Sequence, residues 1–339
     1  MAGHDSCLAS ILCAAFGEPS RDRPHRRLLE GSRYARRDPA MSVSAIPIID
    51  LTPARGDDPV GHLAVAREVD RAAREIGFFV VTGTGIPDAV IDDAFDVLAE
   101  FVALPAHVKD ACRLAEGTLP DDRYTPYGYS GMLEENAFAY MGEMGQPADY
   151  VEKFSLGRVA LDDARALPFP PGPFGAEMRK ALVAYFRHTW TLANVVTGLF
   201  EVGLGKPKGF FTDRIAQSAD SMRCHSYPAM RPDFANSQGM GAHQDGTLVT
   251  LLAYTRPGIE VRMRDGSWLR PPAGRSGDYL INIGDLLSHW TDGAYVSTPH
   301  RAVLTERQRL SIAFFKLTDE DELTEAGDRQ MEALVGRAT

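Results

Sequence analysis

The spacing of apolar residues divides the chain into a helix-rich first part and a strand-rich second part. Residues 58–76, 88–101 and 175–202 show helical patterns, with apolar residues every three or four positions, and the last pattern is the longest. From Ser221 onward, short β-branched and aromatic runs alternate with turn residues, which is typical of strands. Strands are expected at 45–51, 77–82, 153–156, 222–227, 247–254, 259–263, 279–283, 302–304 and 310–315.

The strand-rich part predicts a mainly β core with flanking helices. Asp265-Gly266 between two short strand patterns is a strong hairpin signal. Many short, evenly spaced strands favour a closed or double-sheet β architecture. Residues 116–150 are irregular and rich in Gly, Tyr and Met, as functional loops often are.

Composition limits the classes of partner. The chain has 339 residues and a net charge of -10, which argues against a nucleic-acid backbone or an anionic membrane as partner. No apolar run approaches the roughly 20 residues that span a bilayer. Four cysteines without a CxxC spacing indicate a reducing compartment. We therefore expect a cytoplasmic protein that is a monomer or a weak homo-oligomer and takes a small-molecule substrate.

The first 40 residues differ from the rest in composition. They hold seven arginines and five acidic residues. Residues 7–16 have the length of a signal-peptide core but lack a basic segment before it, and the acids count against a transit peptide. The expected reading is a disordered extension over residues 1–40, with Met41 opening the folded part.

Two histidines and one carboxylate are the candidate metal ligands. His243 and Asp245 stand two apart, and on a strand both would project to one face. His300 follows 57 residues after His243 and would complete the set. Two imidazoles and a carboxylate can occupy one face of Fe(II) and leave other positions open for a co-substrate and O2. A lone HxD tripeptide arises often by chance, and zinc would fit the same ligands, so the motif alone does not fix the metal.

Arg309 and Ser311 are the candidate carboxylate-binding pair. They also stand two apart, so one strand face can present a guanidinium and a hydroxyl to a carboxylate. Tyr227 could supply another hydrogen bond. The alternative is that Arg307 and Arg309 form a solvated charge cluster.

These residues lie in segments that resemble a known family. Residues 46–51, 77–80, 149–157, 222–228 and 282–301 carry the likeness, which extends from Ala45 to about Lys316. They resemble the Fe(II)/2-oxoglutarate-dependent dioxygenases, in the branch that includes isopenicillin N synthase. The resemblance implies a double-stranded β-helix, or jelly roll, with helices packed outside. It implies a division into an N-terminal region over 41–160, central helices over 161–220, the jelly-roll core over 221–320 and a C-terminal helix or tail over 321–339.

The resemblance also implies roles for the candidate residues. His243, Asp245 and His300 would bind Fe(II), and Arg309, Ser311 and Tyr227 would bind the distal carboxylate of 2-oxoglutarate. With O2, the enzyme would hydroxylate, desaturate or cyclise a small metabolite and release succinate and CO2. Because Asp245 is present, halogenation is not expected.

One departure from the family concerns His225, where the family often has asparagine, so the finer co-substrate contacts are open. The candidate substrate contacts are Arg223, Tyr127, Tyr129, Phe154 and Phe315. Residues 123–150 would form a lid, or their aromatic side chains would merely pack on the barrel. Arg223 would meet an anionic group of the substrate, or serve as a structural salt-bridge partner.

Two rival functions remain open at this point. One is an oxidase of the same fold that does not consume 2-oxoglutarate as a co-substrate, as in isopenicillin N synthase, or that fragments it to ethylene. The other is a non-catalytic β-barrel binding protein that retains a metal. Succinate formation separates the first rival from a dioxygenase, and an intact ligand set argues against the second.

Overall fold

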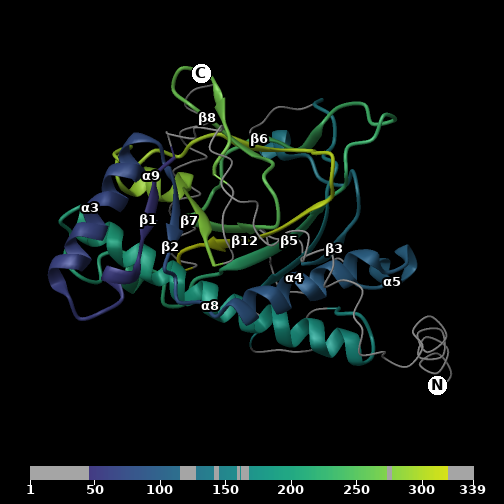
Figure 1. Cartoon of the computed structure of the whole chain (residues 1–339), viewed down its shortest axis with the longest axis horizontal. Helices are drawn as coiled ribbons and strands as arrows, with labels where there is room; N and C mark the ends of the chain where they lie inside the picture. The colour runs from purple at the N-terminus through teal and green to yellow at the C-terminus, as the bar shows by residue number, and fades with distance from the viewer. Residues whose placement is uncertain are drawn as a thin grey trace.

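The protein folds around two facing β-sheets with helices on the outside. A computed structural model describes residues 46–114, 127–140, 145–158, 161, 168–272 and 277–319. The predicted extension (1–40) and the predicted tail (321–339) lie outside these residues. Within them, an eight-stranded sheet has the order β1-β2-β10-β7-β12-β5-β4-β3 and a four-stranded sheet the order β6-β11-β8-β9 (Figure 1).

The strands are β1 (Ile48–Asp50), β2 (Phe78–Thr82), β3 (Gly128–Ser130), β4 (Glu152–Gly157), β5 (Ser221–Tyr227), β6 (Gln238–His243), β7 (Val249–Tyr254), β8 (Ile259–Arg262), β9 (Trp268–Leu269), β10 (Tyr279–Ile283), β11 (His300–Val303) and β12 (Arg309–Lys316). The α-helices are α3 (Pro59–Glu75), α4 (Asp88–Ala103), α5 (Ala106–Asp110), α6 (Ala137–Tyr140), α8 (Pro173–Gly203) and α9 (Asp285–Trp290).

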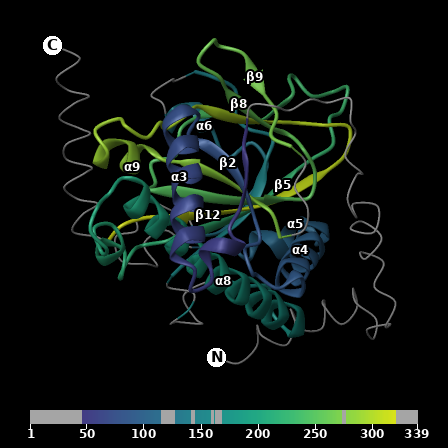
Figure 2. The same ribbon diagram turned by 60° about the vertical axis from the view of Figure 1, so that its left-hand side comes forward.

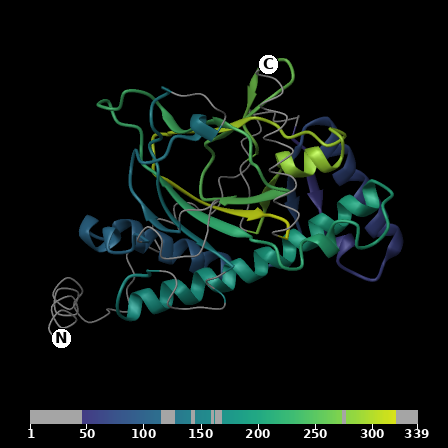
Figure 3. The ribbon, with the colours of Figure 1, turned by 180° about the vertical axis from the view of Figure 1, so that it is seen from behind.

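The long helix α8 covers the outer face of the large sheet. It runs below that sheet on the side away from β6 and β8, and α3 and α4 pack against it (Figures 1 and 3). Local signals set its start, because Gly172 has φ 82° and Pro173 stands at the first helical position. Its apolar face is buried against the sheet, as in the edge-to-face pair of Phe186 and Phe314 at 5.0 Å between ring centroids. This contact forms part of the larger of two cores.

A second core lies between the two sheets. Strand alternation sends successive side chains of β5 to opposite faces. Met222 and Cys224 therefore join the helix-side core, whereas Arg223 and His225 face the space between the sheets. Figure 2 shows the small-sheet strands β8 and β9 above the large sheet and α8 below it. The cavity described below is enclosed by this arrangement.

The predicted helices and most predicted strands are confirmed within one to three residues at their ends. The Asp265-Gly266 hairpin is confirmed as the β8–β9 turn, where Gly266 has φ 85°. Strand β6 is absent from the predicted set, because its sequence, Gln-Gly-Met-Gly-Ala-His, carries two glycines that weaken a strand pattern. The predicted strand 247–254 begins at Val249, so residues 244–248 form a turn.

Candidate metal centre and cavity

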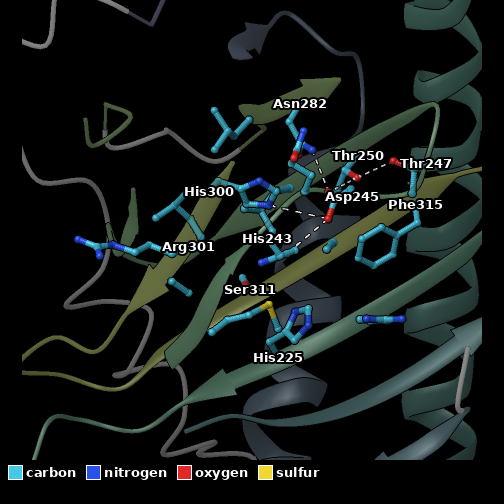
Figure 4. Close-up of a pocket in the computed structure, with 18 of the residues that line it drawn as sticks. His225, His243, Asp245, Thr247, Thr250, Asn282, His300, Arg301, Ser311 and Phe315 are labelled. Carbon is cyan, nitrogen blue, oxygen red and sulfur yellow. Dashed lines mark hydrogen bonds and ion pairs between the residues drawn. The ribbon is translucent and has the colours of Figure 1, made fainter. Parts of the chain in front are cut away.

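Three side chains converge between the sheets. His243 ends β6 and His300 begins β11, and these two residues are direct partners in the antiparallel pair. Asp245 follows two residues later, in the turn before β7. Its Oδ1 lies 3.5 Å from His243 Nε2 and 3.8 Å from His300 Nε2 (Figure 4). The sequence prediction placed Asp245 on a strand beside His243, and that detail is wrong: the turn after β6 brings it to the histidines.

Backbone carbonyls fix the orientation of both imidazoles. His243 Nδ1 lies 2.8 Å from the Gly241 carbonyl, and His300 Nδ1 lies 3.3 Å from the Thr298 carbonyl. A carbonyl only accepts, so each Nδ1 donates its proton and each Nε2 faces the centre, where the neutral ring would present a lone pair to a cation. Such outer hydrogen bonds are typical of metal-ligating histidines.

The carboxylate of Asp245 is held by one of its two oxygens. Oδ2 accepts hydrogen bonds from Thr250 Oγ1 at 2.6 Å and from Asn282 Nδ2 at 2.8 Å. The other oxygen, Oδ1, is left facing the two imidazoles. Asp245 therefore offers one oxygen to an ion, which leaves more of the coordination sphere open than a two-oxygen ligand would.

Electrostatics at the centre keep Asp245 ionised and His300 neutral. Burial disfavours an ionised Asp245, but the charge of His300 and the hydrogen bond with His243 outweigh it and hold its pKa well below the usual range. Burial and the neighbouring charge of His243 lower the pKa of His300 to about 4. For His243, burial acts against the charged form, yet the bond and charge of Asp245 raise the pKa. The donor set of two imidazoles and one carboxylate fits Fe(II).

The centre opens into a cavity of about 470 Å³ between the sheets. One wall consists of alternate residues of β5 and β12, and the metal side consists of residues from β6, β7, β10 and β11. Apolar groups on the walls include Phe78, Leu252, Ile259 and Leu280.

Arg309 is a buried cation at the start of β12. It is 1% exposed, so its interpretation as part of a solvated charge cluster is wrong. Its guanidinium carbon lies 4.1 Å from the ring centroid of Tyr227, its cross-strand partner. Its three nitrogens and the Ser311 hydroxyl are buried without a hydrogen-bond partner among the described residues. Buried polar groups are nearly always paired, so this arrangement fits a carboxylate ligand.

His225 faces the same space. It is paired across the strands with Ser311, is 4% exposed, and has no hydrogen-bond partner at either ring nitrogen within the part of the chain that the structure describes. Burial, followed by the charge of Lys153, holds the pKa of this imidazole well below its usual value. A neutral imidazole therefore stands where the family often has asparagine.

Two of the five candidate substrate contacts lie in the cavity wall. Arg223 and Phe315 line it, and the Arg223 guanidinium lies over the Phe315 ring at 5.1 Å from the centroid.

The other three candidates lie on the helix side of the large sheet, so their prediction as substrate contacts is wrong. Phe154 is buried in the helix-side core, and Tyr129, its partner across β3 and β4, donates to Glu152 at 2.9 Å. Tyr127 is half-buried and packs against the same core. The physical reason is strand alternation: Lys153, beside Phe154, is the residue that points to the inner face. The predicted lid residues 123–126 and 141–144 lie outside the described part.

The sequence prediction missed Thr250 and Asn282, the two residues that hold Asp245. Asn282 left a faint signal, since an amide within the apolar run of β10 requires a buried partner. Thr250 left none, because threonine is common in strands.

The described helices include none that is both long and apolar enough to cross a membrane.

Comparison with known proteins identifies similar sequences along most of the chain. Residues 46–171 match the sequence model of the N-terminal region of a non-haem dioxygenase in morphine synthesis, and residues 218–318 match the 2OG-Fe(II) oxygenase superfamily. Gibberellin 20 oxidase 2 of Oryza sativa is 30% identical over 284 residues, covering 81% of this chain and 68% of its own. Homoarginine-6-hydroxylase 2-ODD-C23 of Glycine max is 29% identical, covering 85% and 90%. Validamycin A dioxygenase of Streptomyces hygroscopicus subsp. limoneus is 28% identical, covering 80% and 76%.

Solved structures show the same fold. A full-length Neurospora crassa protein in complex with alpha-KG and thymine superposes with a TM-score of 0.69 at 22% identity, covering 81% of this chain and 86% of that one. JOX2 in complex with 2OG, Fe and JA superposes with a TM-score of 0.67 at 22% identity, covering 92% and 83%.

Proposed function

Because the chain belongs to the 2-oxoglutarate–Fe(II) oxygenase superfamily, we propose that its three converging side chains hold Fe(II) and that Arg309 holds the co-substrate. The protein is a 2-oxoglutarate-dependent dioxygenase of double-stranded β-helix fold that acts on a small molecule. In the proposal, His243, Asp245 and His300 are the iron ligands. Arg309, Ser311 and Tyr227 bind the distal carboxylate of 2-oxoglutarate. The reaction is hydroxylation of a substrate C–H bond with release of succinate and CO2.

One observation carries the proposal: the centre of two imidazoles and one carboxylate shares a cavity with Ser311, and Arg309 stands two residues before Ser311 on the same strand. The hydroxyl of Ser311 and the nitrogens of Arg309 are buried without a hydrogen-bond partner among the described residues. Fe(II), 2-oxoglutarate and O2 together supply the oxidising chemistry when bound. The chain's own residues orient these groups. Asp245 contributes a single oxygen and the fixed imidazoles contribute one nitrogen each, so open positions remain.

Arg309 and Ser311 would position the co-substrate. A guanidinium binds a carboxylate through two parallel hydrogen bonds, and the Ser311 hydroxyl adds a third. The apolar wall formed by Phe78, Leu252 and Leu280 keeps water from the reacting centre. Sequence similarity to a homoarginine hydroxylase and a validamycin A dioxygenase supports a metabolite as substrate.

The test is succinate formation by anaerobically prepared Fe(II) protein given 2-oxoglutarate, O2 and a pool of small metabolites. We expect substrate-dependent succinate, and Asp245→Ala should lose both succinate formation and bound iron. Asp233→Ala is the control, because Asp233 is a surface carboxylate that is 61% exposed. Unchanged iron content in Asp245→Ala would defeat the ligand assignment. Product formation without succinate would indicate the oxidase that spares 2-oxoglutarate, and ethylene would indicate fragmentation.

We also propose four finer properties of the protein. They are a cytoplasmic location, a monomer or weak homo-oligomer, no nucleic-acid or membrane partner, and the division of the chain at residues 160, 220 and 320. Sedimentation of the purified protein tests the oligomeric state.

A further inference from the structure

The cavity wall contains a guanidinium, that of Arg223, which like Arg309 has no anionic partner among the described residues. Arg223 lines the cavity, its Nε is buried without a hydrogen-bond partner, and it takes part in no ion pair within the described ranges. We propose that Arg223 binds an anionic group of the primary substrate, so that the substrates are small organic acids. This inference rests on the proposed function and names the substrate class for the same site.

The position of Arg223 separates it from the proposed co-substrate site. On β5, Arg223 and Tyr227 are four residues apart and face the same side, a separation of about 13 Å along a strand. Tyr227 is the cross-strand partner of Arg309. One carboxylate cannot bridge the two guanidinium sites at that separation. The co-substrate's distal carboxylate fills one of them, and Arg223 is left for another molecule.

The position also brings Arg223 near the metal side of the cavity. Phe315, which carries the Arg223 guanidinium on its face, is paired across the strands with Thr250. Thr250 is the residue that donates to Asp245. A group bound by Arg223 would therefore lie beside the centre and leave the rest of its molecule within reach of it.

The charges that face the cavity do not neutralise Arg223. Arg301 is another cation in the lining, and it is paired with Glu260 at 2.7 Å and stacked over Trp268. Asp245 is committed to the metal centre. Asp285 lines the cavity at the start of α9, where its Oδ1 accepts a hydrogen bond from Gln244 Nε2 at 3.3 Å. Arg223 is half-buried and its Nε is buried without a hydrogen-bond partner among the described residues, so a bound anion would supply the partner that this nitrogen lacks.

The surroundings of Arg223 strengthen its preference for an anion. Lys153 lies on the neighbouring strand and is paired with Glu135 at 2.5 Å, so it is not itself available to a ligand. Burial, followed by the charge of Arg223, lowers the pKa of Lys153 to about 8. The two cations thus repel each other across β4 and β5, and an anion at Arg223 relieves that repulsion.

The inner wall indicates what the rest of the substrate resembles. Phe315 and the apolar residues Leu252, Leu280 and Ile259 line the cavity that Arg223 and the centre share. Such a wall suits hydrocarbon. The inferred substrate is therefore an amphipathic acid, with its anionic end at Arg223 and a C–H bond at the metal.

The experiment compares carboxylic acids with their neutral amides. Anaerobic Fe(II) protein saturated with 2-oxoglutarate is titrated with phenylacetate, indole-3-acetate and hexanoate, and with the primary amide of each. We expect at least one acid to bind tenfold to a hundredfold more tightly than its amide, roughly the range for a hydrogen bond to a charged group. Arg223→Gln should abolish the difference, Arg223→Lys should keep part of it, and the surface variant Arg231→Gln should leave it unchanged.

The visible charge-transfer band of the Fe(II)–2-oxoglutarate complex keeps the two proposals distinguishable. If no band forms in the wild-type protein, the proposed function fails. If the band forms but acids and amides bind equally in every pair, only the inference fails. Persistence of the acid preference in Arg223→Gln would also overturn it. Loss of the band in Arg223→Gln would assign Arg223 to the co-substrate instead, which contradicts the inference.

Discussion

Replacing Thr250 by valine tests whether the hydrogen bonds on Asp245 Oδ2 prepare the metal centre. The substitution keeps the shape of the side chain and removes the shortest hydrogen bond to that oxygen, at 2.6 Å. Asn282 Nδ2 remains at 2.8 Å. The carboxylate would then be free to turn and to lose the orientation that directs Oδ1 at His243 and His300.

The expected magnitude follows from the charge on the acceptor. A hydrogen bond to an ionised group contributes about 1.5–3 kcal/mol. At about 1.4 kcal/mol per factor of ten, that energy corresponds to a loss of roughly tenfold to a hundredfold in metal affinity. The same range is typical for removal of groups that orient metal ligands.

The assay is an anaerobic titration of Fe(II) against a competing chelator. Thr189→Val is the matched control: Thr189 is also fully buried, and its hydroxyl donates to the Tyr185 carbonyl within α8, outside the cavity lining. We expect weaker iron binding in Thr250→Val and unchanged binding in Thr189→Val. If Thr250→Val bound iron within about a factor of three of the wild type, the argument from Oδ2 would be refuted.

Three further predictions concern buried charges. Arg309→Met should weaken 2-oxoglutarate binding by at least about a hundredfold, which calorimetry measures. It should also raise the unfolding free energy of the co-substrate-free protein by about 1–4 kcal/mol, because it removes a buried unpaired cation. A lower unfolding free energy in urea would contradict this second effect. Burial and the charge of Arg223 lower the pKa of Lys153 to about 8, below its value of about 10.4 in the unfolded chain. Between about pH 8 and about pH 10.4 the folded chain therefore binds fewer protons than the unfolded chain, so its stability rises with pH over that range. Lys153→Met should remove this rise, about 2 kcal/mol between pH 8 and pH 10, and an equal rise in both proteins would count against it. Asp220→Asn should cost about 3–5 kcal/mol in urea unfolding, since Asp220 Oδ2 accepts from the fully buried Lys316 Nζ at 2.9 Å; a loss under about 1 kcal/mol would exclude a stabilising role for the pair.

The elements with strong local patterns could be predicted from the sequence. Helix α8 has a long apolar period, a glycine and proline at its start and Gly205 beyond its end, so its prediction needed no tertiary information. The two-residue spacings of His243 with Asp245 and of Arg309 with Ser311 predicted a metal site and a carboxylate site, and the structure brings the residues of each pair together. Strand β6 could not be predicted from its local pattern, because it is held by pairing with β11, through His243 and His300, which lie far apart in the chain.

The finer parts of the site depend on strand register, which local pattern does not fix. Phe154 was predicted as a substrate contact, but a strand reverses its side chains at every residue, and a shift of one residue exchanges the two faces. The register pairs Lys153 with His225, and it is Lys153 that faces the inner side. The aromatic character of Phe154 therefore did not show which face of the sheet it occupies, whereas the pairing of Lys153 with His225 does.

The unpaired arginines connect the energetics of the fold with its function. A chain selected for stability alone would not keep a 1% exposed Arg309 with three nitrogens unpartnered among the described residues, because an apolar side chain of similar size would stabilise the same core. Arg223 carries a smaller cost of the same kind, because it is half-buried in the cavity wall and its Nε has no partner among the described residues. Both costs are recovered only when an anion is present, so ligand-free protein should be less stable than protein with both ligands bound. The two sites differ in which anion recovers the cost: 2-oxoglutarate alone should satisfy Arg309, whereas stabilisation through Arg223 requires a second acid.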